Sequence, residues 1–195
     1  MPSTSSGQSQ SEYKPSAISV LPSNLRVLVT GSEGFVGKET MKFLEAQGVH
    51  CVGFDVMNGW QDLGDPSTIE QAITANQINR ILHLAAVARF KDADDNPLKA
   101  FEVNCLGTAN ISRIASKYHI PVIYASTGSV YMPIKRPPPI TEDFPVQGNS
   151  VYGCSKAVGE GYVQQSTAPW MILRYAHLYG KEKRQHGLIG GFLER

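Results

Sequence analysis

The chain has 195 residues, of which 42% are hydrophobic and 18% charged, and its formal net charge is +1 at pH 7. This composition is typical of one soluble globular domain, and no apolar run approaches the length of a membrane-spanning helix. A net charge so close to zero gives no electrostatic reason to expect a nucleic acid or a membrane surface as a partner.

The cysteine and histidine residues form no pattern that would hold a metal ion. Cys51, Cys105 and Cys154 lie far apart without a CxxC pair, and the five histidines show no ligand spacing. We therefore expect no metal site. Scattered cysteines without a disulfide pattern are typical of a reducing compartment, so we expect a cytoplasmic protein.

Residues 1–24 are rich in Ser, Gln and Pro and show no hydrophobic period. They lack the basic start and apolar core of a secretory signal, and they lack the arginines of a mitochondrial presequence. We expect a disordered tail here and a single folded domain over residues 25–195.

A strand, a glycine-rich turn and a helix are predicted next. Residues 25–30 form a β-branched run, Gly31-Ser-Glu-Gly34-Phe-Val-Gly37 follows, and residues 38–47 carry Met41 and Leu44 at helical spacing. Glycines let the backbone approach a pyrophosphate, and the helix N-terminus offers N–H groups and a positive dipole end. Three glycines at this spacing also occur in plain tight turns, so the motif alone is a weak signal.

A second buried-looking strand over residues 49–54 is closed by Asp55. An acid about twenty residues after the glycines can accept both hydroxyl groups of an adenosine ribose. The same carboxylate would repel a 2′-phosphate, which favours NAD over NADP. Without the glycines, a turn-initiating aspartate would be an equally good interpretation of Asp55.

Helices and strands continue to alternate after Asp55. Small residues, Ala85 and Ala86, end the third predicted strand and would let a cofactor lie close to the backbone. The fourth strand delivers Ser126 and Thr127 to its carboxyl end, where parallel sheets bind their ligands. The predicted helices cover residues 66–75 and 97–118, and the strands residues 80–84, 121–125 and 170–174. We expect the inner side of the long helix to consist of Phe101, Cys105, Ile111 and Ile114.

Tyr152 and Lys156 are four residues apart, so on a helix they share one face. A free tyrosine has a pKa near ~10, and a cation beside it would lower that pKa and make it a better base. An ordinary surface helix could also carry such a pair. We expect residues 155–165 to be helical, with Val158, Tyr162 and Val163 on one side.

The alternation of strands and helices predicts an α/β fold: a doubly wound, mostly parallel, Rossmann-like sheet in three layers. Against this background the chain resembles the extended short-chain dehydrogenase/reductase superfamily, in its NAD-dependent epimerase/dehydratase branch for nucleotide sugars. The resemblance runs from residue 25 to the end. Its motifs are Thr30-Gly-Ser-Glu-Gly-Phe-Val-Gly37, Asp55, Asp62-Leu63, His83-Leu-Ala-Ala86, Asn104-Cys-Leu-Gly-Thr108, Ser126-Thr127, Val130-Tyr131, Tyr152-Gly-Cys-Ser-Lys156 and Arg174-Tyr175.

The resemblance implies roles for individual residues. Tyr152 would be the catalytic base, Thr127 the catalytic hydroxyl, and Lys156 would support both the base and the nicotinamide ribose. Asp55 would bind the adenosine ribose. The remaining cofactor-binding residues implied are Gly31, Gly34, Phe35 and Val36 at the pyrophosphate, Asp62 and Leu63 at the adenine, Leu84, Ala85, Ala86 and Asn104 along the channel, and Tyr175 near the nicotinamide.

The chain also departs from the family pattern. Gly128 and Ser129 stand where family dehydratases carry acids, which argues against dehydration; Met132 and His177 replace a usual Gly and Asn. We expect the chain to stop before most of the C-terminal substrate lobe.

Our first hypothesis from the sequence is an NAD-dependent epimerase or related oxidoreductase acting on a nucleotide sugar. The sequence leaves open whether the protein forms a homodimer. The second is a dinucleotide-binding module without turnover, acting as a redox sensor or a subunit scaffold.

Overall fold

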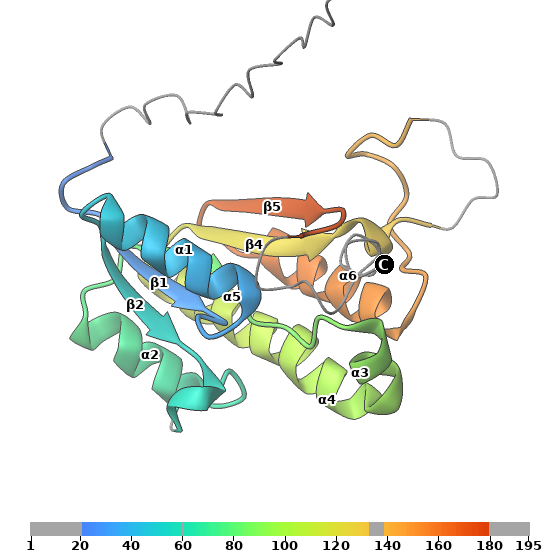
Figure 1. The fold of residues 1–195 in the computed structure, drawn as a ribbon, viewed down its shortest axis with the longest axis horizontal. Coiled ribbons are helices and arrows are strands. Elements are labelled where there is room, and N and C mark those ends of the chain that lie inside the picture. The colour runs from blue at the N-terminus through green and yellow to red at the C-terminus, as the bar shows by residue number, and fades with distance from the viewer. Residues whose placement is uncertain (1–20, 60, 133–138, 180–195) are drawn as a thin grey trace, which may run out of the picture.

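The computed structural model describes residues 21–59, 61–132 and 139–179 (Figure 1). Most of the expected tail therefore lies outside the described residues, as does the end of the expected domain from residue 180 onward. Among the described helices, none combines the length and the apolar character that crossing a membrane requires.

Five parallel strands form one sheet in the order β2-β1-β3-β4-β5, which confirms the predicted fold class. From β1, which lies inside the sheet, the chain moves outward to the edge strand β2 and then crosses to β3 on the other side of β1. In such sheets a ligand crevice forms at the carboxyl ends of the strands where this reversal occurs. The strands are β1 (Arg26–Thr30), β2 (His50–Phe54), β3 (Arg80–His83), β4 (Val122–Thr127) and β5 (Trp170–Tyr175).

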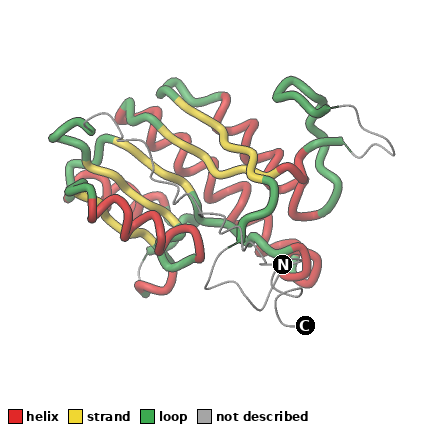
Figure 2. The backbone as a smooth tube through the Cα atoms, turned by 45° about the horizontal axis from the view of Figure 1, so that its top comes forward, coloured by secondary structure: helices red, strands yellow, loops and turns green. Residues whose placement is uncertain are grey.

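Helices cover the two faces of the sheet and make three layers (Figure 1, Figure 2). Alternate residues of β1 point to opposite faces, as the pleat requires. Val27 and Val29 pack with Met41 and Leu44 of α1, whereas Leu28 belongs to the larger core beneath α2 and α5. The helices of these layers are α1 (Phe35–Ala46), α2 (Pro66–Ala75), α5 (Thr108–Tyr118) and α6 (Val151–Gln164).

The predicted long helix over residues 97–118 is one continuous helical run with an irregular centre. It consists of α4 (Pro97–Phe101), the π-helical segment η2 (Glu102–Gly107) and α5. Cys105, Ile111 and Ile114 are buried as expected, but Phe101 is 50% exposed, so its expected inner position is wrong. A π-turn bonds i to i+5 instead of i+4 and so shifts the face that an α-helical period would assign to residues before it.

Helix α6 begins at Val151, because the Ser150 hydroxyl caps it by accepting a hydrogen bond from the Gly153 N–H. Its expected apolar side is only partly correct: Val163 is buried, but Val158 and Tyr162 are each more than 40% exposed. The shorter elements, which the sequence did not indicate, are α3 (Phe90–Asp95), η1 (Val56–Asn58) and η3 (Gly128–Val130).

Candidate functional site

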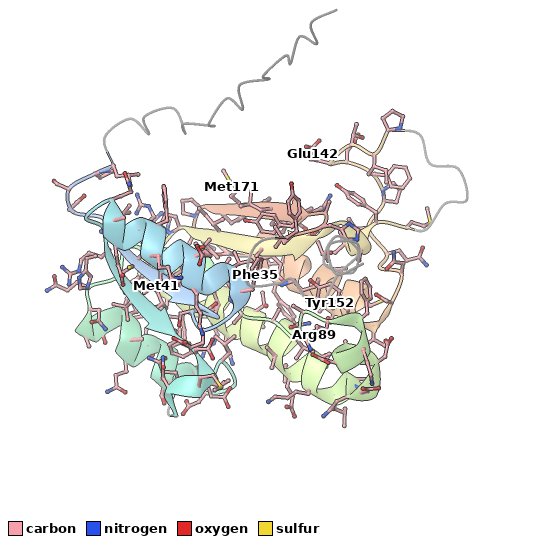
Figure 3. The ribbon with its side chains drawn as sticks, in the orientation of Figure 1. Phe35, Met41, Arg89, Glu142, Tyr152 and Met171 are labelled. Atoms are coloured by element: carbon pink, nitrogen blue, oxygen red, sulfur yellow. The ribbon has the colours of Figure 1, made fainter. Side chains whose placement is uncertain are left out.

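The carboxyl edge of the sheet gathers the residues that the sequence singled out. The glycine turn leaves the end of β1, Asp55 follows β2, and Ala85 follows β3. Thr127 is the last residue of β4, and Tyr175 is the last residue of β5, paired with it in register. Figure 3 shows Phe35, at the start of α1, and Tyr152, on α6, lying on the same side of the molecule. The parallel strands bring the residues at their carboxyl ends to this one edge.

The glycine turn is held in a shape that side chains would prevent. Gly31 has a φ of +70°, and a Cβ there would lie 2.7 Å from the backbone of Ala85. A Cβ on Gly37 would lie 2.1 Å from the carbonyl oxygen of Gly31. The Gly34 N–H donates to that same carbonyl. The turn therefore brings bare backbone to the edge of the sheet at the N-terminus of α1.

The Asp55 carboxylate is fixed by backbone donors on two sides. Its Oδ2 accepts a 3.1 Å hydrogen bond from the Glu33 N–H of the glycine turn, and its Oδ1 accepts one of 3.1 Å from the Met57 N–H. An ionised carboxylate has about four acceptor positions, so two remain for a ligand.

Gln61 is a residue that the sequence did not indicate. It is 7% exposed, and its Oε1 accepts hydrogen bonds from the Asp55 N–H at 2.8 Å and from Asn58 Nδ2 at 2.7 Å. It thereby closes the turn that presents Asp55. A glutamine in a loop has no sequence signal of its own, because its partners are set by the fold.

A cavity of about 400 Å³ opens along this edge. The glycine turn forms one wall, and the loop after β3 forms another. Sequence-predicted residues among its lining are Gly31, Gly34, Phe35, Val36, Asp55, Asp62, Leu63, Leu84, Ala85 and Ala86, joined by others that include Val87, Lys99 and Val103.

Asn104 lies behind the cavity and is fully buried. Its Oδ1 accepts from the Val87 N–H at 2.8 Å, and its Nδ2 donates to Val87 O at 3.1 Å and to Ser155 Oγ at 2.9 Å. The side chain therefore ties a cavity wall to the turn of α6 that carries Lys156. The structure thus places Asn104 as a bridge, while its predicted contact with a cofactor stays a prediction.

Thr127 and Tyr152 lie together beside this bridge. The Phe90 ring packs edge-on against Tyr152, with the two ring centroids 5.5 Å apart. Burial raises the pKa of Tyr152, while the nearby Thr127 hydroxyl opposes that shift. The Thr127 hydroxyl also accepts from the Ser129 N–H at 3.2 Å.

Lys156 is 1% exposed, and its Nζ has no hydrogen-bond partner within the described parts of the chain. The ammonium lies over the ring of Tyr124, 4.0 Å from its centroid. Burial lowers the pKa of Lys156 from 10.5 to about 7, although Glu160 and Cys105 oppose the shift. The pair is on one helix, as predicted, but Lys156 rests on Tyr124 and does not lower the pKa of Tyr152 here.

One turn further along α6, Glu160 forms a buried ion pair with Arg174 of β5. Arg174 Nε and Nη2 donate to the two carboxylate oxygens at 2.9 and 2.8 Å, and Ser126 Oγ donates to Oε1 at 2.5 Å. Arg174 Nη1 reaches the Tyr131 hydroxyl at 3.1 Å. This network joins β4, β5 and α6, and the sequence did not indicate Glu160 as a member.

His83, at the end of β3, is a buried structural residue. Its Nδ1 lies 2.6 Å from Thr30 Oγ1 and its Nε2 lies 3.0 Å from Thr108 Oγ1. Burial, with the nearby Lys156 charge second, lowers the pKa of His83 to about 3, so the ring is neutral at pH 7. Across residues 21–59, 61–132 and 139–179, His, Cys, Asp and Glu form no group of three that could hold a metal ion.

The family of the chain follows from its sequence. A family model described as "RmlD substrate binding domain" matches residues 25–191. The chain belongs to this family. It is thereby a member of the extended short-chain dehydrogenase/reductase superfamily, as the motifs indicated.

Known members of this superfamily are similar to the chain in sequence and in structure. The dTDP-4-dehydrorhamnose reductase of Streptomyces griseus is 28% identical, over 80% of this chain and 50% of that protein. The UDP-glucose 4-epimerase of Thermus thermophilus, solved with NAD, is 31% identical with a TM-score of 0.76, over 85% of this chain and 60% of the other. The dTDP-4-dehydrorhamnose reductase of Bacillus anthracis, solved with NADP, is 27% identical with a TM-score of 0.74, over 80% and 55%.

The chain spans about half to three-fifths of the length of the curated relatives that it matches. These relatives include nucleotide-sugar epimerases and a nucleotide-sugar reductase, so the superfamily is one of enzymes. The chain shares its fold with these relatives, and its own activity is a separate question.

The residues present fit a dinucleotide. A Cβ on Gly31 or Gly37 would close the cradle at the N-terminus of α1, where a pyrophosphate would lie. Asp55 keeps acceptor positions for ribose hydroxyls at one end of the cavity. Lys156 Nζ is a buried donor without an acceptor in the described chain, and the hydroxyls of a second ribose would supply acceptors.

Proposed function

We propose that this protein is an NAD-dependent epimerase or related oxidoreductase that acts on a nucleotide sugar. One observation carries the proposal. The cavity lined by the glycine turn and Asp55 is joined, through the buried Asn104 and Ser155, to helix α6, which carries Tyr152 and Lys156. A cofactor cradle and a candidate proton-transfer group thus share one edge of the sheet.

In this function the chain's residues bind the cofactor and handle the proton. The glycine turn holds the pyrophosphate, Asp55 accepts from the adenosine ribose, and Lys156 donates to the nicotinamide ribose. Bound NAD⁺ supplies a hydride acceptor. Tyr152 Oη takes the proton of the sugar hydroxyl whose carbon is oxidised, and the Thr127 hydroxyl hydrogen-bonds the same oxygen.

The residues after Thr127 favour epimerisation or reduction over loss of water. Elimination needs an acid beside the leaving hydroxyl, and Gly128 and Ser129 occupy those positions in η3. Neither side chain is an acid that could protonate a leaving group at neutral pH. A dehydratase is therefore disfavoured.

A non-catalytic dinucleotide-binding module is the second candidate, and one observation favours it. Burial raises the pKa of Tyr152, and the Lys156 cation lies over Tyr124. In this arrangement the tyrosine is a poor base. Such a module would bind the cofactor through the same cavity and carry out no hydride transfer.

Cofactor titration and turnover separate these candidates. NADH binding is followed by fluorescence, and hydride transfer is assayed over a panel of nucleotide sugars. Tyr152→Phe should abolish most turnover with NADH affinity nearly unchanged. Tyr162→Phe, on the exposed side of the same helix, is the matched control and should behave as wild type. NADH binding without turnover would support the module, and absence of NADH binding would overturn both candidates.

A further inference from the structure

Lys156 is held in an unusual way for a buried cation. Its ammonium has no hydrogen-bond partner in the described structure, and the Tyr124 ring face lies 4.0 Å away. We propose that Tyr124 is a positioning residue whose ring holds the Lys156 ammonium with its N–H groups free to bind the cofactor ribose. This inference rests on the proposed function for the ribose, and on geometry alone for the contact between the two residues.

Tyr124 is itself fixed from several sides. It is fully buried in β4, three residues before Thr127 on the same strand. Its ring centroid lies 5.4 Å from that of His83, and its hydroxyl donates to Lys156 O at 3.5 Å. The ring face that meets the ammonium therefore has little freedom to turn.

The absence of a side chain at Gly159 leaves room for the Tyr124 hydroxyl. A Cβ on Gly159 would lie 2.2 Å from the Tyr124 hydroxyl and 3.0 Å from its Cζ. A glycine in the middle of a helix is less favourable than an alanine there, so its presence in α6 needs a packing reason. The tyrosine hydroxyl supplies that reason.

An aromatic ring face can hold the Lys156 ammonium without using its hydrogen-bond donors, which a carboxylate would use. A carboxylate would accept hydrogen bonds and occupy the N–H donors, whereas an aromatic face attracts the cation through its quadrupole and accepts few of them. Glu160, four residues along α6, could have paired with Lys156. Its carboxylate is instead occupied by Arg174 on both oxygens and by Ser126. No acceptor in the described structure therefore occupies the three ammonium N–H donors.

Several titratable groups surround Lys156 and must be considered in a pH experiment. Glu160 and Cys105 favour its charged form, and the pKa of His83 is lowered in part by the Lys156 charge. Of these, Glu160 is already paired and His83 is neutral at pH 7. The groups that interact with Lys156 are His83 from β3, Tyr124 from β4, Cys105 from η2 and Glu160 from α6.

A double-mutant cycle tests the contact without any cofactor. Tyr124→Phe keeps the ring, and Tyr124→Leu and Tyr124→Met remove it. Thermal unfolding at pH 7 should show the non-aromatic variants to be less stable than Tyr124→Phe. In a Lys156→Met background this gap should shrink, because the cation that needed the ring is gone. If the stability difference between Tyr124→Phe and the non-aromatic variants is the same in the wild-type and the Lys156→Met background, the ring serves packing alone and the proposal is overturned. The same conclusion follows if the non-aromatic variants fold in neither background.

Cofactor binding tests the consequence for the ribose. NADH affinity of Tyr124→Phe should stay within about twofold of wild type, and that of the non-aromatic variants should be weaker by about tenfold. Lys156→Met should abolish this difference. If wild type binds no NADH, the proposed function and the ribose role fail together, while the stability cycle still decides the contact. Equal NADH affinity for the phenylalanine and leucine variants would overturn the positioning role.

Discussion

The orientation of the Asp55 carboxylate is set by the N–H groups of Glu33 and Met57. No Lys or Arg occurs in residues 55–59 to accept a 2′-phosphate. We therefore expect NADH to bind more tightly than NADPH by roughly 1–3 kcal/mol, because the phosphate would meet a fixed anion. Fluorescence titration with both reduced cofactors measures this difference.

Asp55→Asn should reduce the preference for NADH over NADPH, because it removes the negative charge and keeps a hydrogen-bond acceptor. Asp62→Asn is the matched control, since Asp62 lines the same cavity and is exposed. It should leave the preference unchanged. Equal affinity of wild type for both cofactors would make Asp55 a turn residue alone.

Lys156 should make stability depend on pH. Its pKa is about 7 in the folded protein and 10.5 ordinarily. Between these values the unfolded chain holds a proton that the folded chain has released, so the free energy of unfolding rises with pH across this window. Lys156→Met should flatten the rise and stabilise the protein at pH 7 by roughly 1–4 kcal/mol. Urea unfolding between pH 6.5 and about 10.5 measures both effects.

Other groups also titrate in this window, so the slope of the variant is compared with that of wild type. Lys91→Met provides the control, because Lys91 is an exposed lysine whose ion-pair partner, Asp95, lies on the same surface helix. It should keep the wild-type slope. A Lys156→Met protein that is less stable at pH 7 would contradict a desolvated cation.

At the residue scale, the sequence predicted which residues meet at the sheet edge but not their partners. Spacing placed Tyr152 and Lys156 on one helical face, and this needed no knowledge of the rest of the fold. Tyr124 and Glu160 were not indicated. Tyr124 comes from a strand more than 30 positions earlier, and Glu160 has its partner in the next strand. Contacts of this kind depend on tertiary packing.

At the scale of elements, the π-helical segment η2 presents Asn104 to the core. Asn104→Ala would leave Val87 N–H and C=O without their side-chain partner. We expect a loss of about 1–3 kcal/mol in the free energy of unfolding, since buried polar groups would be left unsatisfied. Chemical denaturation measures it. Asn110→Ala, which removes one hydrogen bond to Leu63 O, should cost less. Equal costs would argue against the bridge.

In α4, just before η2, and in α6, hydrophobic periodicity predicted some exposed residues to be buried. Phe101 was assigned to the inner face because a 3.6-residue period was carried through η2, where the i to i+5 bonding breaks it. On α6 the buried face holds Lys156, Gly159 and Glu160, while Val158 faces solvent. A helix that builds a site places polar residues inward, so its pattern is a poor guide to its orientation.

For the whole molecule, strand and helix alternation was sufficient to predict the three-layer parallel sheet and the edge at which residues gather. The predicted and observed strands differ by no more than two residues at either end. The size of the cavity and the link from its wall to α6 through Asn104 could not be predicted from the sequence, because both depend on how loops pack. The homodimer stays a prediction, which sedimentation velocity tests.

Ligand binding should stabilise the whole fold, because a ligand that binds only the folded protein shifts the unfolding equilibrium toward it. NADH at 100 times its Kd should raise the free energy of unfolding by about 2.7 kcal/mol. For a chain of this size that corresponds to roughly 5–10 °C in Tm. Lys156→Met should change the Tm without NADH and the rise in Tm caused by NADH in opposite directions. The variant should melt higher than wild type without NADH, since it buries no charge, and should gain less from the same NADH concentration, since it loses a ribose contact. Differential scanning fluorimetry with and without NADH measures both shifts, and Lys91→Met should match wild type in each. A variant that gains as much as wild type would show that Lys156 does not touch the ligand, and the assignment of the nicotinamide ribose to this lysine would then be wrong.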